Sequence, residues 1–221
     1  MNIARLKSDP EIFYSLQGEG AQVGTPAVFL RLAGCNLSCT WCDTKHSWGA
    51  GVELPVAEVA QRLQAYTCRH LVITGGEPLL QQGELEELLE LLLPPDYVVE
   101  VETNGSIAPS RALRQRVDWW NVSPKLRHSG NDAGAALCFD ALETFAEMPN
   151  VWFKFVVQGE ADWRDIDALE LPQHQIMLMP CAATRAELAA ARPAVAEMCL
   201  QHGVRLGERL HLVLWDTKKG V

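Results

Sequence analysis

The sequence contains no long apolar run and no excess of basic residues. The longest leucine-rich stretch, Leu85 to Leu93, is interrupted by glutamates and is too short to span a bilayer. Lys and Arg number 19 against 28 Asp and Glu, which gives a formal net charge of −9. Because binding to a nucleic-acid backbone draws on basic patches, we expect neither a nucleic acid nor a membrane as a partner.

An even set of cysteines and a secretory leader are also missing. The seven cysteines are an odd number, and Met1 to Glu11 is polar where a leader would be apolar. These features predict a cytoplasmic protein with reduced thiols. The sequence has no internal repeat or low-complexity linker, and 221 residues are enough for one sizeable core. We therefore expect a single domain over residues 1–221.

Three cysteines crowd into eight residues directly after an apolar run. Cys35, Cys39 and Cys42 follow the stretch Ala27 to Leu32 on one short loop. Thiols that converge from one loop suit a soft metal or an iron-sulfur cluster. Three thiolates can hold three irons of a [4Fe-4S] cluster and leave the fourth iron open for chemistry. The loop at 33–46 is therefore a candidate cluster site.

A structural zinc site is the main alternative for this loop. Cys35, Cys39, Cys42 and His46 would supply a Cys3His tetrahedron, which zinc accepts. Zinc ligands usually come as two close pairs with a longer spacer between them, whereas these four residues share one loop. In that case the chain would be a zinc-stabilised binding module, which iron and sulfide analysis would distinguish from a cluster protein.

Apolar runs alternate with segments of helical periodicity after residues 1–25, which show little periodicity of either kind. Strands are expected at 27–32, 71–74, 97–103, 119–123, 151–157 and 175–179. Helices are expected at 56–63, 84–93, 109–117, 135–145, 162–169 and 184–202, the last kinked or broken at Pro193. The stretch 206–215 is ambiguous and is expected to be partly extended.

Six strands that alternate with helices predict parallel pairing through right-handed crossovers. A complete eight-unit barrel needs about 250 residues, which exceeds the length of this chain. The predicted fold class is therefore α/β, an open partial (β/α)6 barrel with mostly parallel strands.

Polar motifs follow the strands at the end where such folds carry their chemistry. Besides the cysteine loop, these are Gly75-Gly76-Glu77-Pro78, Glu102-Thr103-Asn104 and Ser123-Pro124-Lys125. Two glycines let a ligand approach the backbone, whose carbonyls can accept hydrogen bonds from an ammonium group, although a tight turn would also explain them. The hydroxyl and cation of the last motif suit a carboxylate or a ribose, although most lysines lie on the surface.

Together these motifs resemble the radical S-adenosylmethionine (SAM) superfamily and, within it, the 7-carboxy-7-deazaguanine synthase family. The superfamily resemblance rests on Cys-x3-Cys-x-aromatic-Cys followed by Gly-Gly-Glu. The family resemblance rests on Leu16 to Gly20, Arg31, Asp43-Thr44, Thr74 to Pro78, Glu102 to Gly105 and Ser123 to Lys125. Another small radical SAM enzyme, such as a glycyl-radical activase, is an alternative that Leu16 to Gly20 and Arg31 argue against.

The resemblance implies a carbon-nitrogen lyase that contracts the ring of 6-carboxy-5,6,7,8-tetrahydropterin. The product would be 7-carboxy-7-deazaguanine, formed with release of ammonia on the route to queuosine and other 7-deazapurines. The implied cofactors are a [4Fe-4S] cluster, SAM, which is regenerated in each cycle, and Mg²⁺. The implied protein partners are a one-electron donor of the flavodoxin or ferredoxin type and a second copy of the chain in a homodimer.

The same resemblance assigns roles to individual residues. The cluster would be held by Cys35, Cys39 and Cys42, and Mg²⁺ by Thr44. Contacts to SAM are expected from Trp41, Cys42, Asp43, Gly76, Glu77, Glu102, Ser123, Pro124 and Lys125. The pterin pocket would be lined by Leu16, Gln17, Gly18, Glu19, Arg31, Thr74 and the carboxylate of Val221, with residues 204–221 closing it. The planar guanidinium of Arg31 suits the carboxylate of the substrate.

Two segments leave open what they do in this chain. His211 is either a substrate contact or a partly buried histidine, with the second favoured. Met179 to Ala182 stands where relatives often have a Gln-Pro run near adenine, so only its backbone is expected to serve.

Overall fold

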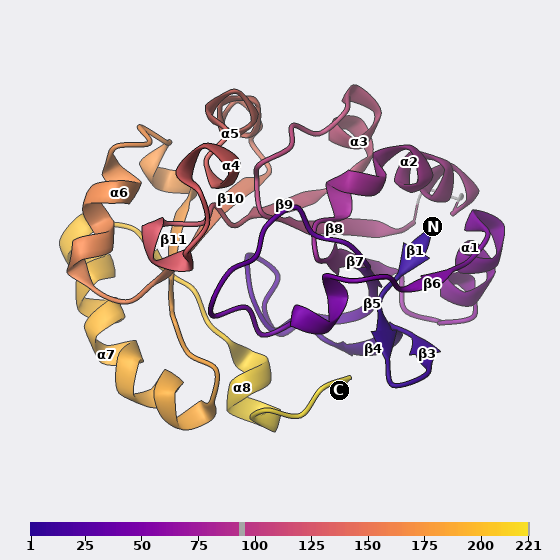
Figure 1. Cartoon of the computed structure of the whole chain (residues 1–221), viewed down its shortest axis with the longest axis horizontal. Coiled ribbons are helices and arrows are strands. Elements are labelled where there is room, and N and C mark those ends of the chain that lie inside the picture. The colour runs from indigo at the N-terminus through magenta and orange to yellow at the C-terminus, as the bar shows by residue number, and fades with distance from the viewer. Residues whose placement is uncertain (93–95, 221) are drawn as a thin grey trace.

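A curved, open sheet organises residues 1–92 and 96–220, which the computed structural model describes (Figure 1). Its centre consists of six strands in chain order, and every neighbouring pair among them is parallel. These are β5 (Pro26–Leu32), β7 (His70–Gly75), β8 (Val98–Thr103), β9 (Trp119–Val122), β10 (Val151–Val157) and β11 (Ile176–Pro180). The expected open α/β partial barrel with mostly parallel strands is confirmed.

Short strands extend the sheet at both edges. At one edge β12 (Arg205–Leu206) pairs parallel with β11. At the other, β5 pairs antiparallel with β4 (Ile12–Leu16) and with β1 (Asn2–Ile3), and β1 pairs with β6 (Val52–Glu53). The strands β2 (Arg5–Leu6) and β3 (Asp9–Pro10) form a separate small ribbon.

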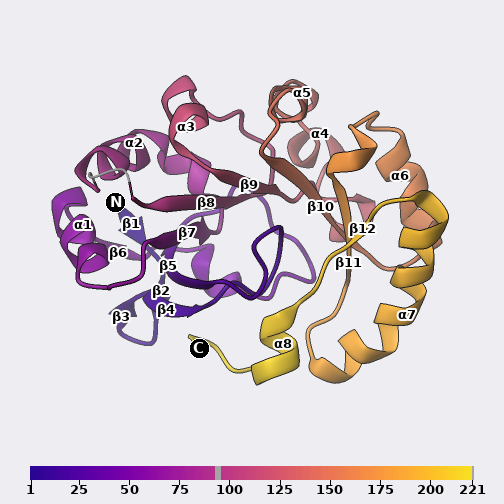
Figure 2. The same cartoon turned by 180° about the vertical axis from the view of Figure 1, so that it is seen from behind.

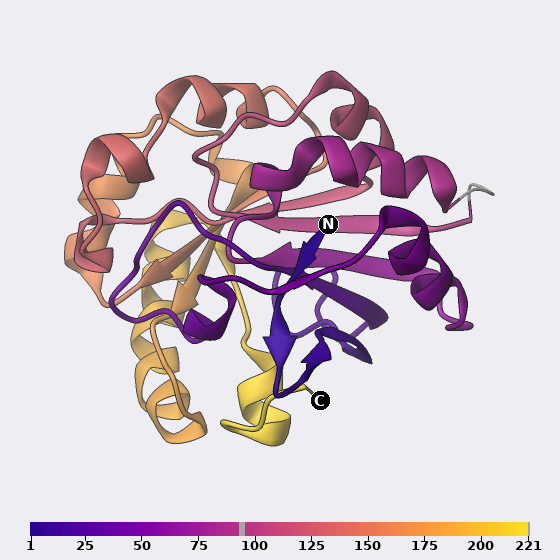
Figure 3. The same ribbon diagram turned by 45° about the vertical axis from the view of Figure 1, so that its right-hand side comes forward.

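Within the described residues, seven α-helices lie along the outside of the curved sheet, and one lies on its other side. The outer helices are α1 (Val56–Gln64), α2 (Gln82–Leu91), α3 (Arg111–Arg116), α4 (Ala133–Ala136), α5 (Phe139–Ala146), α6 (Trp163–Asp167) and α7 (Arg185–His202). Helix α8 (Leu210–Trp215) lies across the sheet from α2 and α3 (Figure 3). None of the helices within the described ranges is long and apolar enough to cross a membrane.

Side chains of the central strands alternate between the core under the helices and the opposite face. In β5, Leu30 is fully buried in the core, whereas Arg31 lines a pocket on the other face. In β10, Phe153 and Phe155 are fully buried, and Lys154 between them lines the same pocket. The two-residue period that predicts a strand therefore also separates core residues from site residues.

Several expectations about the elements need correction. The helix expected at 135–145 is two helices, because Leu137 and Cys138 leave the helical conformation and Leu137 packs against the cysteine loop. The break expected at Pro193 is absent from α7, where this proline lies on the exposed face. Of the stretch 206–215, Leu206 belongs to β12 and the last six residues form α8. Position 93, the expected end of a helix, lies outside the described residues.

The strands before residue 25 had no counterpart in the sequence pattern. Strand β4 pairs with β5 over five residues, with Phe13 opposite Phe29 and Tyr14 opposite Val28. The two-residue strands are too short to show a period, and β4 carries a mixture of side chains on both of its faces. Its pairing with β5 delivers the following loop, residues 17–25, to the pocket.

Candidate functional site

A large pocket of about 460 Å³ opens on the face of the sheet away from α1–α7. Its walls come from the carboxyl ends of the central strands, the loop after β4, the cysteine loop and the C-terminal segment. It gathers most residues that the sequence assigned to a site: Leu16, Gln17, Gly18, Glu19, Arg31, Cys35, Cys39, Trp41, Cys42, Asp43, Thr44, Thr74, Gly76, Glu102, Ser123 and Lys125. Glu77 and Pro124 do not line it, and Val221 lies outside the described residues.

The three cysteines are spaced too widely for one zinc ion. Tetrahedral zinc with Zn–S bonds of about 2.3 Å needs sulfurs about 3.8 Å apart. Among the described residues, the one set of three possible metal-ligating side chains whose donor atoms all lie within 4.8 Å of one another is Glu19, Asp43 and His211. His46, the fourth ligand of a zinc site, is bonded instead to Glu11, with Nε2 and Oε2 2.8 Å apart. This spacing argues against a single zinc ion, and an iron-sulfur cluster, which is larger than a single ion, suits three thiols on one loop better.

Hydrogen-bond donors already surround two of these sulfurs. The backbone N–H of Leu37 donates to Cys35 Sγ at 3.4 Å, and Asn131 Nδ2 donates to Cys39 Sγ at 3.1 Å. The orientation of the Asn131 amide is fixed, because its Oδ1 accepts from the backbone N–H of Ser38 at 2.8 Å. Donors to cysteine sulfur stabilise the negative charge of a bound cluster. No motif or periodicity predicts this role for Asn131, which is 92 residues from its cysteine.

The cysteine loop rests directly on Gly76. A Cβ atom at this position would lie 2.1 Å from the carbonyl oxygen of Gly34 and 2.8 Å from Cys35 Cβ. The backbone N–H of Glu77 donates to the same Gly34 oxygen at 2.8 Å. Only glycine lets the two loops meet this closely, so the Gly-Gly turn positions the first cysteine as well as forming part of the pocket wall.

Glu77 acts inside the protein rather than on the pocket surface. Its carboxylate is fully buried and accepts hydrogen bonds from Leu79 N at 3.0 Å, Thr103 Oγ1 at 2.7 Å and Asn104 N at 2.7 Å. Burial raises the pKa of Glu77, and these donors oppose the shift. The side chain expected to contact SAM therefore ties the end of β8 to the turn after β7.

The side-chain amide of Gln17 likewise forms its hydrogen bonds within the protein. Its Nε2 donates to Glu100 Oε1 at 2.7 Å and to Glu102 Oε1 at 3.1 Å, and its Oε1 accepts from the backbone N–H of Glu19 at 3.3 Å. Glu100 is fully buried beneath the pocket and pairs with His70 Nε2 at 3.0 Å. Burial raises the pKa of Glu100. Gln17 thus fixes the loop after β4 to the floor of the pocket.

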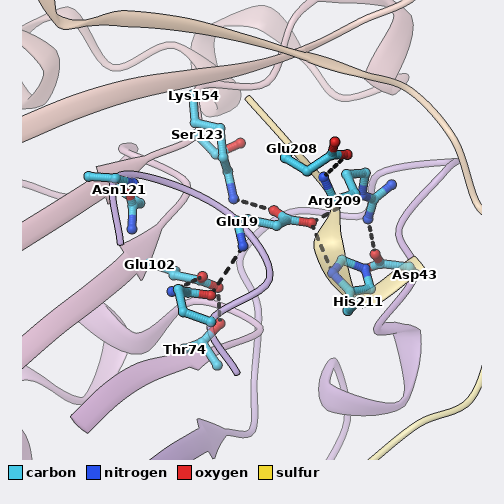
Figure 4. Close-up of polar contacts among 12 residues, drawn as sticks. Glu19, Asp43, Thr74, Glu102, Asn121, Ser123, Lys154, Glu208, Arg209 and His211 are labelled. Carbon is cyan, nitrogen blue, oxygen red and sulfur yellow. Dashed lines mark hydrogen bonds and ion pairs between the residues drawn. The ribbon is translucent and has the colours of Figure 1, made fainter. Parts of the chain in front are cut away.

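Glu102 and Thr74 present polar atoms on that floor. Thr74 Oγ1 donates to Glu102 Oε2 at 2.9 Å, and both residues line the pocket (Figure 4). Arg31, on the neighbouring strand, donates from Nε to Glu11 Oε1 at 2.9 Å. A carboxylate on β8 and a guanidinium on β5, with β7 between the two strands, are therefore available to recognise a substrate with both donor and acceptor groups.

Lys125 and Trp41 meet at the other side of the pocket. Lys125 Nζ donates to the backbone oxygen of Ser123 at 2.6 Å and to Ser123 Oγ at 2.8 Å, and it lies 5.9 Å from the centre of the Trp41 ring. Burial lowers the pKa of Lys125. Trp41 Nε1 donates to His128 Nδ1 at 3.0 Å, which holds the indole in the cysteine loop.

A group of four charged side chains joins the loop after β4 to the cysteine loop, and all of them except the exposed Asp43 are largely buried (Figure 4). Lys154 Nζ donates to Glu19 Oε2 at 2.5 Å, and Arg209 Nε donates to Glu19 Oε1 at 3.0 Å. Arg209 also pairs with Asp43. Burial alone would raise the pKa of Glu19, but the charges of Lys154 and Arg209 outweigh burial and hold that pKa well below its usual range.

Neither cation of this group was predicted from the sequence. Lys154 carried one signal, because it is the single charged residue within the apolar strand 151–157. Arg209 carried none, since its partner Glu19 lies 190 residues away. His211 is partly exposed, lines the pocket, and has Nδ1 3.9 Å from Glu19 Oε1. Met179 also lines the pocket.

Comparison with known proteins gives consistent matches. The sequence model of the radical SAM superfamily matches residues 30–125. A 7-carboxy-7-deazaguanine synthase of Pyrobaculum aerophilum is 41% identical over 217 residues, which cover 95% of each chain. One of Halobacterium salinarum is 37% identical and covers 93% of this chain and 89% of its own. The crystal structure of QueE from Escherichia coli matches with a TM-score of 0.66 at 31% identity, covering 91% of this chain and 92% of that one.

Proposed function

Because the chain belongs to the 7-carboxy-7-deazaguanine synthase family of the radical SAM superfamily, we propose that it converts 6-carboxy-5,6,7,8-tetrahydropterin to 7-carboxy-7-deazaguanine. The reaction releases ammonia and makes the protein a carbon-nitrogen lyase of queuosine biosynthesis. The observation that carries the proposal is the composition of this pocket. It joins a three-cysteine loop, a Gly-Gly turn and a charged floor in a chain that matches these relatives over nearly its whole length.

The residues of the pocket fit the cluster and SAM. When bound, the two supply one-electron chemistry that removes a hydrogen atom from the substrate and later returns it, so that SAM is regenerated. Cys35, Cys39 and Cys42 hold the cluster at the pocket wall. The backbone at Gly75-Gly76 is open to an ammonium group, and Ser123 with Lys125 offers a hydroxyl and a cation to the rest of SAM.

The opposite half of the pocket is suited to the pterin. The guanidinium of Arg31 would bind the carboxylate of the substrate. Glu11 fixes the orientation of this guanidinium by accepting a hydrogen bond from Arg31 Nε. Thr74, Glu19 and the backbone at 16–18 supply polar contacts around the ring. Phe13 and Phe29 stack with ring centres 5.1 Å apart and form an apolar wall that excludes water on this side.

Further parts of the proposal concern the remaining cofactor and the partners. Thr44 lines the pocket beside Cys42, where its hydroxyl would be the one protein ligand of a Mg²⁺ ion that completes its shell from substrate and water. Residues 204–221, with the carboxylate of Val221, would close the pterin side. We also propose a cytoplasmic homodimer of single-domain chains that is reduced by a flavodoxin or a ferredoxin.

Anaerobic turnover tests the proposal. The reconstituted protein would be mixed with SAM, a strong reductant, Mg²⁺ and 6-carboxytetrahydropterin, and mass spectrometry would follow the deazaguanine acid. We expect the acid to form with the wild type and not with Cys39→Ala. Cleavage of SAM without deazaguanine would reject the substrate. Protein that contains zinc but neither iron nor sulfide would reject the whole proposal.

A further inference from the structure

One guanidinium joins three separate segments around the pocket. Arg209 donates from Nε to Glu19, from a second nitrogen to Asp43 and from the third to the backbone oxygen of Ala182. Its side chain is only 9% exposed. All three nitrogens of the side chain are therefore used within the protein, and together they bind the loop after β4, the cysteine loop and the loop after β11.

Backbone hydrogen bonds also attach the residues on either side of Arg209 to the loop after β4 and to strand β11. The N–H of Leu210 donates to the carbonyl oxygen of Gly18 at 2.8 Å, and that of Gly207 donates to the carbonyl oxygen of Leu178 at 2.7 Å. A Cβ at position 18 would lie 2.6 Å from the Nδ1 atom of His211. The C-terminal segment thus packs against the loop after β4 without room for a side chain between them (Figure 2 shows its path from β12 to α8).

Removing Arg209 would leave two carboxylates facing each other. Donor oxygens of Glu19 and Asp43 lie within 4.8 Å of one another and of a His211 nitrogen. Arg209 lies between these carboxylates, and Lys154 balances the second negative charge from the far side of Glu19 (Figure 4). Two like charges at such a distance repel, and the repulsion is stronger here than in water because Glu19 is largely buried, although Asp43 is 46% exposed.

We propose that Arg209 is a positioning residue that locks the C-terminal segment, residues 204–220, over the pocket and sets the loop after β4 against the cysteine loop. Glu19 belongs to the first loop, and Asp43 follows the cluster ligand Cys42 on the second. Because one planar group holds both carboxylates, it fixes the separation of the part of the pocket suited to the pterin from the part suited to the cluster and SAM. The expected effect of Arg209 on turnover of the pterin rests on the proposed function. Its expected effect on the conformation of the two loops and the C-terminal segment does not.

Hydrogen-deuterium exchange on the protein without substrate tests the lock. In Arg209→Gln, we expect peptides covering 204–220 and 40–46 to exchange at least tenfold faster than in the wild type. Peptides from β8 should exchange at an unchanged rate, because the hydrogen bonds of the Arg209 side chain go to Glu19, Asp43 and Ala182 and not to that strand. Wild-type exchange rates in both segments would overturn the proposal.

Arg192→Gln is the matched control. Arg192 pairs with Glu208 in the same region at 2.9 Å, but both side chains are 36% exposed. Loss of this half-exposed pair should leave exchange in 40–46 unchanged. If exchange in β8 were also faster in Arg209→Gln, Arg209→Lys would distinguish a local effect from general destabilisation. Lysine keeps the charge but replaces three donor nitrogens by one. It should accelerate the two segments without β8, and wild-type protection in Arg209→Lys would overturn the proposal.

Kinetic measurements distinguish a positioning role of Arg209 from a purely stabilising role. We expect Arg209→Lys to raise KM for the pterin at least tenfold, and more 5'-deoxyadenosine to form per product molecule. Arg192→Gln should show neither change. A wild type that fails to convert the pterin would refute the proposed function while leaving the exchange result intact. An active Arg209→Lys with wild-type KM and coupling would refute the positioning role.

Discussion

Single side chains in the pocket have little freedom, because most of their polar atoms are already paired. Gln17 uses both of its amide atoms in contacts to three residues, and the Glu77 carboxylate accepts three hydrogen bonds. Residues that the family resemblance assigns to ligands therefore include some whose side chains hold the site in shape. Such residues are tested by physical properties of the protein rather than by activity alone.

Asn131→Leu should make the reduction potential of the bound cluster more negative. The amide donates to Cys39 Sγ, and a donor to sulfur favours the reduced, more negatively charged cluster. A tenfold change in the one-electron equilibrium corresponds to about 59 mV, and we expect a shift of that order. A redox titration followed by electron paramagnetic resonance would measure it.

Asn36→Ala is the control for this variant. Asn36 lies on the cysteine loop and donates to Ser106 Oγ at 2.8 Å rather than to a sulfur. The reduction potential of the cluster in Asn36→Ala should equal that in the wild type. Equal potentials for Asn131→Leu and the wild type would show that the amide does not act on the cluster.

Glu100→Gln should gain stability relative to the wild type as pH rises. Burial raises the pKa of Glu100 above its value of about 4.3 in an unfolded chain. A carboxyl group whose pKa is raised in the folded state contributes stability that is fully present below its unfolded pKa. This stability is lost as pH rises through the folded pKa. Since glutamine does not ionise, the variant avoids this loss, by about 1.4 kcal/mol for each unit of pKa shift. Urea unfolding from pH 4 to 8 would measure the difference.

Glu19→Gln should show the opposite trend. The pKa of Glu19 is lowered, so its contribution is present above the unfolded pKa and is lost as pH falls through the folded pKa. The variant should therefore lose stability relative to the wild type as pH rises towards about 4.3, the pKa of Glu in an unfolded chain, and urea unfolding from pH 2 to 5 would measure this. If either variant's difference stayed constant across its own pH range, the charge state assigned to that residue would be wrong.

At the level of elements, the parallel strands and the motifs after them could be predicted because both follow local rules. A run such as 151–157 shows its strand character within seven residues, and a strand's carboxyl end marks the site in this class of fold. The short strands β1 and β6 and the break after α4 depend on contacts with distant segments. The sequence pattern carries no record of such contacts.

Gly76→Ala tests whether the turn after β7 supports the cysteine loop. The added Cβ would overlap the Gly34 carbonyl, so the loop must move. We expect lower iron content after reconstitution and a free energy of unfolding reduced by about 1–3 kcal/mol. Iron analysis and urea unfolding would check both.

Gly83→Ala provides the comparison. Gly83 lies in α2, and a Cβ there meets no atom within 4 Å. This substitution should raise stability by about 0.5–1 kcal/mol and leave iron content unchanged. Full iron content in Gly76→Ala would contradict the role assigned to the turn.

Across the whole molecule, segments from both ends of the chain complete a pocket that the central strands begin. Glu19 and Arg209 are 190 residues apart and share a hydrogen bond. Neither periodicity nor motif spacing can reveal such a pair, because its formation depends on the curvature of the sheet and the path of the chain after β12. The cysteine loop could thus be predicted from sequence, whereas the charges that set it against the loop after β4 could not.

The ratio of product formed to SAM consumed distinguishes the proposed ring contraction from other radical SAM reactions. Both compounds would be quantified in one anaerobic reaction with limiting SAM and excess 6-carboxytetrahydropterin. We expect many molecules of 7-carboxy-7-deazaguanine for each SAM cleaved, because the proposed reaction regenerates SAM. One SAM cleaved for each product, or SAM cleavage with no deazaguanine, would contradict it.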